Sequence, residues 1–94
     1  MFIDDSESDR VLFRHVLQFI DDTIEYLTAI DGEDGLDYLI SSAAKLPDYI
    51  FVDINMPRMN GIEFLEKIKA IKALSNIPVI IYSTAAVSDQ TIIW

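Results

Sequence analysis

The sequence predicts an α/β fold in which a doubly wound parallel sheet carries helices on both faces. Two observations favour this class. Short apolar runs typical of buried strands alternate with segments whose apolar residues recur at helical spacing, in the order βαβαβαβα. Polar residues directly follow several of the apolar runs, and the functional groups of parallel α/β sheets lie at these carboxyl ends of the strands.

The first predicted strand and helix lie at the start of the chain. Phe2-Ile3 is interpreted as the end of a strand that leads into Asp4-Asp5. Ser6, followed three residues later by Asp9, has the spacing of a capping box and is expected to begin a helix. Four apolar residues then fall on one face of this helix: Leu12, Val16, Phe19 and Ile20.

A second strand and helix follow. Residues 24–30 are rich in β-branched and aromatic side chains and predict a strand, which Asp31-Gly32 ends. The next segment has the apolar spacing of a helix, and Pro47-Asp48 ends it. The apolar residues of this helix are Leu36, Leu39, Ile40 and Ala43.

The third strand is predicted most clearly. Residues 49–52 form a continuous apolar run, as expected of a parallel strand buried on both faces, and lead directly into Asp53. Asn60 and Glu63 then have capping-box spacing and predict the start of a third helix. The faces of that helix are marked by Ile62, Leu65, Ile68 and either Ile71 or Lys72.

The last predicted strand covers residues 79–82, after Pro78. Ser83-Thr84 stands at its end. Ser88-Asp89 is a candidate cap for a fourth helix, of which only the beginning lies within the chain.

Composition excludes several classes of function. The chain has 94 residues, 51% of them hydrophobic, and shows no repeat or linker, so residues 1–94 are read as one domain. Its net charge of −9 is opposite to the basic surface that nucleic-acid binding needs. It contains no cysteine and no apolar run long enough to span a membrane, and a cytoplasmic location is expected.

Three carboxylates are candidates for one site. If the first and third strands are neighbours, their ends lie about 4.8 Å apart, the spacing of paired strands. Asp4, Asp5 and Asp53 would then share one pocket, where a proton or a hard cation must relieve their mutual repulsion. Read separately, Asp4-Asp5 is also typical of a helix entry, and Ser83-Thr84 of a turn.

The chemistry of such a pocket is that of phosphoryl transfer. Oxygen ligands without His or Cys select Mg²⁺, or Mn²⁺, over zinc. An aspartate beside the cation can attack phosphorus and form an acyl phosphate. Asp53 is the best candidate because it stands alone at its strand end, whereas the adjacent Asp4 and Asp5 suit metal binding, Asp5 directly and Asp4 through a water molecule. Ser83 can donate a hydrogen bond to a phosphoryl oxygen.

These residues resemble the receiver domain of two-component response regulators, and the resemblance covers the whole chain. The matching segments are Asp4-Asp5, residues 47–61 (PDYIFVDINMPRMNG) and residues 78–85 (PVIIYSTA). The resemblance implies a flavodoxin-like fold with strand order 2-1-3-4-5.

The resemblance also implies a role for each site residue. Asp53 would be the phosphoacceptor, and Asp4 and Asp5 the acidic pair that binds Mg²⁺. Asn55 would be a further metal ligand through its backbone carbonyl, and Ser83 would be the switch hydroxyl.

The chain departs from the family pattern at its C-terminal side. Family members continue into a fifth strand that ends in Lys-Pro and a fifth helix, and no lysine here matches that one. The chain is therefore interpreted as an incomplete receiver domain. We expect the outer edge of the fourth strand to be uncovered, which leads to a marginal monomer or to a dimer through that edge.

The leading hypothesis is a signalling module that is not an enzyme. It takes a phosphoryl group on Asp53 from a histidine kinase or a phosphotransfer protein and then changes its partner binding. One alternative is an Mg²⁺-dependent phosphohydrolase of the haloacid dehalogenase type, which Asn55 argues against because such enzymes place a general-acid Asp there. The other alternative is a pseudo-receiver that binds partners without phosphorylation.

Overall fold

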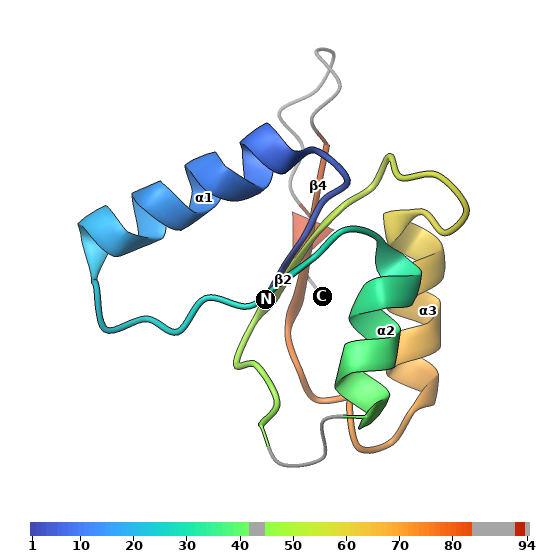
Figure 1. Ribbon diagram of the computed structural model, residues 1–94. Helices are drawn as coiled ribbons and strands as arrows, with labels where there is room; N and C mark the ends of the chain where they lie inside the picture. Colours follow the sequence, from blue (N-terminus) through green and yellow to red (C-terminus); the bar gives the residue numbers. More distant parts are fainter. Residues whose placement is uncertain (42–44, 84–91, 94) are drawn as a thin grey trace.

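The computed structural model describes residues 1–41, 45–83 and 92–93 (Figure 1). Three helices occur in these residues: α1 (Glu7–Ile20), α2 (Gly32–Ser41) and α3 (Gly61–Ala70). The same residues contain five strands: β1 (Phe2–Ile3), β2 (Thr28–Ala29), β3 (Ile50–Asp53), β4 (Val79–Tyr82) and β5 (Ile92–Ile93). No helix in this part of the chain has the length and apolar character needed to cross a bilayer.

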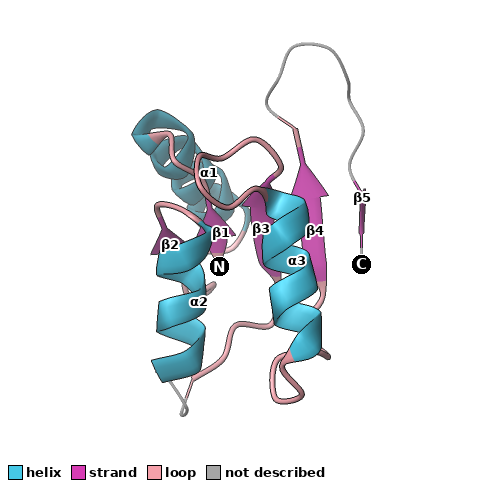
Figure 2. Cartoon of the chain, turned by 90° about the vertical axis from the view of Figure 1, so that its right-hand side faces the viewer, coloured by secondary structure: helices cyan, strands magenta, loops and turns pink. Residues whose placement is uncertain are grey.

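The strands form one sheet in the order β2-β1-β3-β4-β5. The pairs β1–β2, β1–β3 and β3–β4 are parallel, which confirms the flavodoxin-like order 2-1-3-4. Phe2 lies opposite Phe51, so β1 is placed directly beside β3. The helices α2 and α3 cover one face of the sheet, and α1 lies on the other (Figure 2). The arrangement therefore has three layers, with β1 and β3 at its centre.

The hydrophobic core lies between the sheet and the α2–α3 layer. Ile3, Ile50, Val52 and Val79 of the strands are fully buried and belong to one cluster with residues of the two helices. The buried residues of α3 are Gly61, Phe64, Leu65 and Ile68. Leu65 and Ile68 were predicted, but Phe64 takes the place expected for Ile62, which lies on the solvent side.

The capping predictions hold where the structure describes them. The Ser6 hydroxyl accepts a hydrogen bond from the Asp9 N–H at the start of α1 (3.3 Å). Asn60 and Glu63 form a complete capping box, with the Asn60 side chain accepting from the Glu63 N–H (2.8 Å). These local contacts set the point at which α3 leaves the loop after β3.

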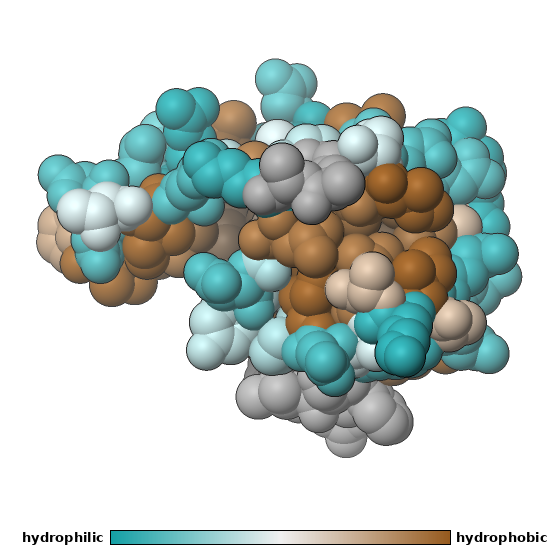
Figure 3. Space-filling view, turned by 90° about the horizontal axis from the view of Figure 1, so that it is seen from below, coloured by the Kyte–Doolittle hydropathy of each residue, from teal (hydrophilic) through white to brown (hydrophobic). Residues whose placement is uncertain are grey.

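The apolar face predicted for α1 is present, but no residue of this helix is buried. Phe13 makes the main described contact with the sheet, because its ring stacks on Phe2 with centroids 4.1 Å apart. Phe19 is 92% exposed. In the space-filling view of Figure 3, hydrophobic residues are visible on the projecting part of the molecule that the end of α1 and the following loop form.

Two strand predictions need correction. The second strand was expected over residues 24–30 but covers only Thr28–Ala29, because its partner β1 is itself two residues long. The outer edge of the fourth strand was expected to be unpaired. Instead, β5 pairs with it in antiparallel orientation, with Ile81 opposite Ile92. The candidate cap Ser88-Asp89, like Ala43 of the second helix, lies outside the described residues.

Candidate metal centre

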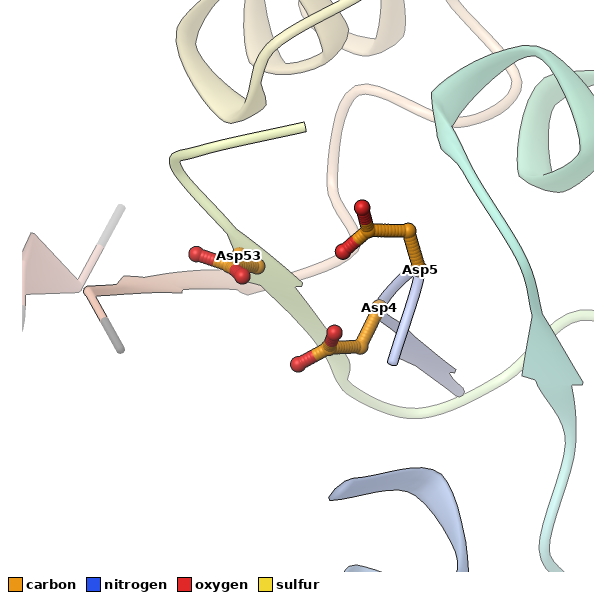
Figure 4. A group of neighbouring side chains, drawn as sticks. All are labelled: Asp4, Asp5 and Asp53. Carbon is orange, nitrogen blue, oxygen red and sulfur yellow. The ribbon is translucent and has the colours of Figure 1, made fainter. Parts of the chain in front are cut away.

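Asp4, Asp5 and Asp53 come together at the carboxyl edge of the sheet. Asp4 and Asp5 directly follow β1, and Asp53 is the last residue of β3. Because these neighbouring strands are parallel, both end at the same edge. One carboxylate oxygen from each residue lies within 4.8 Å of the others, and the side chains point into a common space (Figure 4).

The three carboxylates have different access to solvent. Asp4 is fully buried and Asp53 is 2% exposed, whereas Asp5 is on the surface. The pocket therefore has two carboxylates anchored in the protein and one at its mouth. Among the described residues, Asp5 is therefore the carboxylate through which the pocket meets solvent.

Three hydrogen bonds hold Asp4, two to its carboxylate and one to its backbone carbonyl. Its Oδ1 accepts from the Ser6 N–H (2.8 Å), and its Oδ2 accepts from the hydroxyl of Tyr82 (2.7 Å). The guanidinium of Arg10 donates to its backbone carbonyl (2.6 Å). The Ser6 and Tyr82 donors offset the cost of burying the Asp4 carboxylate beside two others.

Asp53 is fixed by its own loop. The N–H of Asn55 donates to its Oδ1 (3.0 Å), and the N–H of Ile54 donates to the carbonyl of Tyr82 (2.9 Å), which extends the β3–β4 pairing by one residue. Gly61 allows α3 to begin close by, since a Cβ there would lie 2.8 Å from the Asp53 carbonyl oxygen. Because α3 begins so close to the end of β3, the loop between them stays packed against the site.

Ser83 and Asn55 lie next to each other at the same edge. The amide of Asn55 donates a long hydrogen bond to the Ser83 hydroxyl (3.4 Å). The structure thus brings all five sequence-predicted site residues, Asp4, Asp5, Asp53, Asn55 and Ser83, to one end of the sheet.

The sequence analysis placed Tyr82 only at the end of the fourth predicted strand and missed its contact with Asp4. Burial, and then the hydrogen bond to Asp4, raises the pKa of Tyr82, so the hydroxyl stays protonated and donates. Its position gave a usable signal, because Tyr82 ends β4 and lies opposite Asp53 in the β3–β4 register.

The donor set fits a hard divalent cation. The converging ligand atoms are all carboxylate oxygens, and no His or Cys takes part among the described residues. Such sets favour Mg²⁺ or Mn²⁺, which usually bind one or two carboxylates together with water and phosphate oxygens.

A 2-1-3-4 parallel sheet with this acidic pocket at its carboxyl edge defines a class, that of the flavodoxin-like signalling receivers. The response regulator receiver domain model matches residues 1–93. The chain therefore belongs to the response regulator receiver domain family.

Curated relatives agree with this assignment. The chain is 37% identical over 78 residues to the sensor histidine kinase CheAY of Helicobacter pylori, covering 83% of the chain and 9% of the relative. It is 42% identical over 83 residues to a protein-glutamate methylesterase/protein-glutamine glutaminase of Clostridium acetobutylicum, covering 87% and 22%. The chain thus spans less than a quarter of either relative.

Solved structures are similar over most of the chain. The phosphorylated cyanobacterial phytochrome response regulator RcpA matches with a TM-score of 0.80 at 32% identity, covering 90% of this chain and 64% of that one. A receiver protein domain from Methanoculleus marisnigri matches with a TM-score of 0.78 at 31% identity, covering 93% and 67%.

Proposed function

We propose that this domain is the phosphoacceptor of a two-component phosphorelay and receives a phosphoryl group on Asp53. The observation that carries the proposal is the convergence of Asp4, Asp5 and Asp53 at the carboxyl edge of the sheet, in a member of the receiver family. The likeness to a sensor histidine kinase supports a histidine kinase or a phosphotransfer protein as the donor.

The transfer requires a nucleophile and compensation of charge. An Asp53 carboxylate oxygen attacks phosphorus, the bond between phosphorus and the donor's imidazole nitrogen breaks, and that nitrogen keeps the electron pair. An acyl phosphate on Asp53 is the product. Mg²⁺, held by the carboxylates of Asp5 and Asp53 and the backbone carbonyl of Asn55, would supply positive charge that offsets the phosphoryl oxygens.

Ser83 supplies the response to phosphorylation. It lies at the end of β4 beside Asn55, whose amide donates to the Ser83 hydroxyl, and on phosphorylation of Asp53 this hydroxyl would donate to a phosphoryl oxygen. A change in the hydroxyl's partner would alter the start of the following segment and so the surface presented to partners. Phosphorylation would thereby be converted into partner binding.

The proposal is tested by small-molecule phosphorylation. The unchanged chain, Asp53→Asn and Asp37→Asn are incubated with acetyl phosphate and Mg²⁺, and intact mass is measured. Asp37 is an exposed carboxylate of α2 and serves as the matched control. We expect one added phosphoryl group on the unchanged chain and on Asp37→Asn, and none on Asp53→Asn.

Two results would contradict the proposal. Equal uptake by Asp53→Asn would place the acceptor elsewhere. An unchanged chain that binds Mg²⁺ but takes no phosphoryl group would support a pseudo-receiver instead.

A further inference from the structure

A groove of about 370 Å³ lies between α1 and the face of the sheet opposite α2 and α3 (Figure 2). Helix α1 supplies Leu12, Phe13 and Val16 to its walls, and the sheet supplies Phe51 of β3 and Ile80 of β4. Leu12 is 61% exposed and Val16 is 48% exposed, so the apolar wall formed by α1 is open to solvent. A groove of this volume is in the size range of sites for small molecules.

The end of the groove nearest the carboxyl edge of the sheet is acidic. Asp4, Asp9 and Tyr82 also line the groove, and the Tyr82 hydroxyl donates to Asp4 (2.7 Å). Burial and the hydrogen bond to Asp4 are the main causes that raise the pKa of Tyr82, and the charges of Asp53 and Asp9 raise it further. Among the described residues, no Lys, Arg or His lines the groove. The electrostatic potential at this end is therefore negative, which favours a ligand with a positive charge.

Of the two carboxylates that line the groove, Asp9 is the one that can take a new partner. Asp4 is fully buried, and its two oxygens already accept hydrogen bonds from the Ser6 N–H and from Tyr82. Asp9 is half-buried in the first turn of α1, where its backbone N–H donates to the Ser6 hydroxyl. Within residues 1–41, 45–83 and 92–93, its carboxylate accepts no hydrogen bond and forms no ion pair. A cationic group that donates to this carboxylate would form a charge-assisted hydrogen bond.

We propose that this groove binds a small amphipathic amine, with an apolar body against Phe13 and Ile80 and an ammonium group bound to Asp9. The walls gain from burial of an aromatic or branched alkyl body. An anion of the same shape is repelled by Asp9, and a neutral analogue forgoes the charge-assisted bond. The proposal goes beyond phosphoryl transfer and does not depend on phosphorylation of Asp53.

The first test uses the unchanged chain and three probes that share one phenyl-ethyl body. Phenethylamine is the cation, 2-phenylethanol the neutral analogue and 3-phenylpropionate the anion. Methyl ¹³C NMR titrations follow Leu12, Val16 and Ile80 in the groove, with Ile62 of α3 as an internal control on the other layer. We expect phenethylamine to shift the groove methyls but not Ile62. It should bind about three- to fivefold more tightly than the alcohol, and the anion should bind most weakly.

The second test asks whether Asp9 is the group that recognises the ammonium. Asp9→Asn should remove the difference in dissociation constant between phenethylamine and 2-phenylethanol. Glu7→Gln is the matched control, because it removes the same charge from the exposed side of the first turn of α1, and Glu7 does not line the groove. We expect this control to retain the preference for the amine.

Three results would overturn the proposal. Groove methyls that do not shift up to the solubility limit of phenethylamine would show that the groove is not a site for this class of ligand. Equal dissociation constants for the three probes would show that charge is not recognised. A loss of preference in Glu7→Gln as large as that in Asp9→Asn would assign the attraction to the acidic surface in general. None of these results bears on phosphorylation of Asp53, so failure of this inference leaves the proposed function intact.

Discussion

The guanidinium of Arg58 forms an ion pair with the carboxylate of Asp31, joining the loop after β3 to the start of α2. Arg58 has a left-handed backbone conformation (φ 66°), and Asp31 is buried. Next to this pair, Met59 packs so closely on Gly32 that a Cβ there would lie 2.8 Å from the methionine sulfur. The loop that carries Asn55 is thus fastened to a helix on the same side of the sheet.

Two substitutions of Arg58 should distinguish the free energy that the ion pair contributes from the strain of the left-handed backbone at Arg58. Arg58→Ala should lower the free energy of unfolding by about 1–3 kcal/mol, because buried Asp31 loses a charged partner. Arg58→Gly loses the same pair but relieves the positive φ, so it should be less destabilising than Arg58→Ala by about 1 kcal/mol. Urea unfolding measures both, and equal midpoints for the two variants would show that the backbone is not strained.

The pH dependence of Asp31 follows from its partners. The hydrogen bond from the Asp34 N–H, assisted by Arg58, lowers the pKa of Asp31 below its ordinary value of 3.8, against the opposing effect of burial. A carboxyl with a lowered folded-state pKa stabilises the fold above its unfolded pKa, and this contribution is lost as pH falls through the folded value.

We therefore expect Asp31→Asn to be less stable than the unchanged chain at neutral pH, with a difference that shrinks below about pH 4. Urea unfolding from pH 7 to pH 3 measures it, with Asp37→Asn as the exposed control. A difference that does not vary with pH would show that the charge of Asp31 does not contribute.

Gly61→Ala should destabilise the fold and disturb the site. The new Cβ would lie 2.8 Å from the carbonyl oxygen of Asp53 and 2.9 Å from the Cα of Ile54, and this backbone cannot move without shifting Asp53. We expect a loss of about 1–3 kcal/mol. Gly35→Ala is the matched control, since its Cβ would first meet the end of the Ile3 side chain, which can rotate. Equal losses in denaturant unfolding would contradict this distinction.

The exposed helix α1 should unfold locally more easily than α3, which packs on the core. No residue of α1 is buried, whereas α3 buries Phe64, Leu65 and Ile68. Amide hydrogen exchange should therefore be faster in the middle of α1 than in the middle of α3. Protection of α1 equal to that of α3 would mean that α1 is covered in solution.

Truncation of two phenylalanines should change the free energy of unfolding by very different amounts. Phe19→Ala should change the free energy of unfolding by less than about 0.5 kcal/mol, because the ring is 92% exposed. Phe64→Ala should cost about 3–5 kcal/mol, because that ring is fully buried in the core. Thermal or urea unfolding of the two variants checks the contrast, and a large loss in Phe19→Ala would again indicate a covered α1.

The sequence alone determined the features that depend on neighbouring residues. The cap at Ser6 and the capping box at Asn60 each join residues three positions apart, and both were readable from spacing. The continuous apolar run before Asp53 identified a buried parallel strand, and the polar residues after three of the predicted strands identified the sheet edge at which Asp4, Asp5, Asp53 and Ser83 lie. Local hydrogen bonding and periodicity are sufficient for these predictions.

The tertiary structure alone decided what depends on residues far apart in the chain. The antiparallel β5 depends on pairing with β4, and the choice of Phe64 over Ile62 as the buried residue of α3 depends on how that helix sits on the sheet. The Tyr82–Asp4 bond joins residues 78 positions apart. Such contacts depend on strand order and on the orientation of packed side chains, and neither is encoded in the residues adjacent to them.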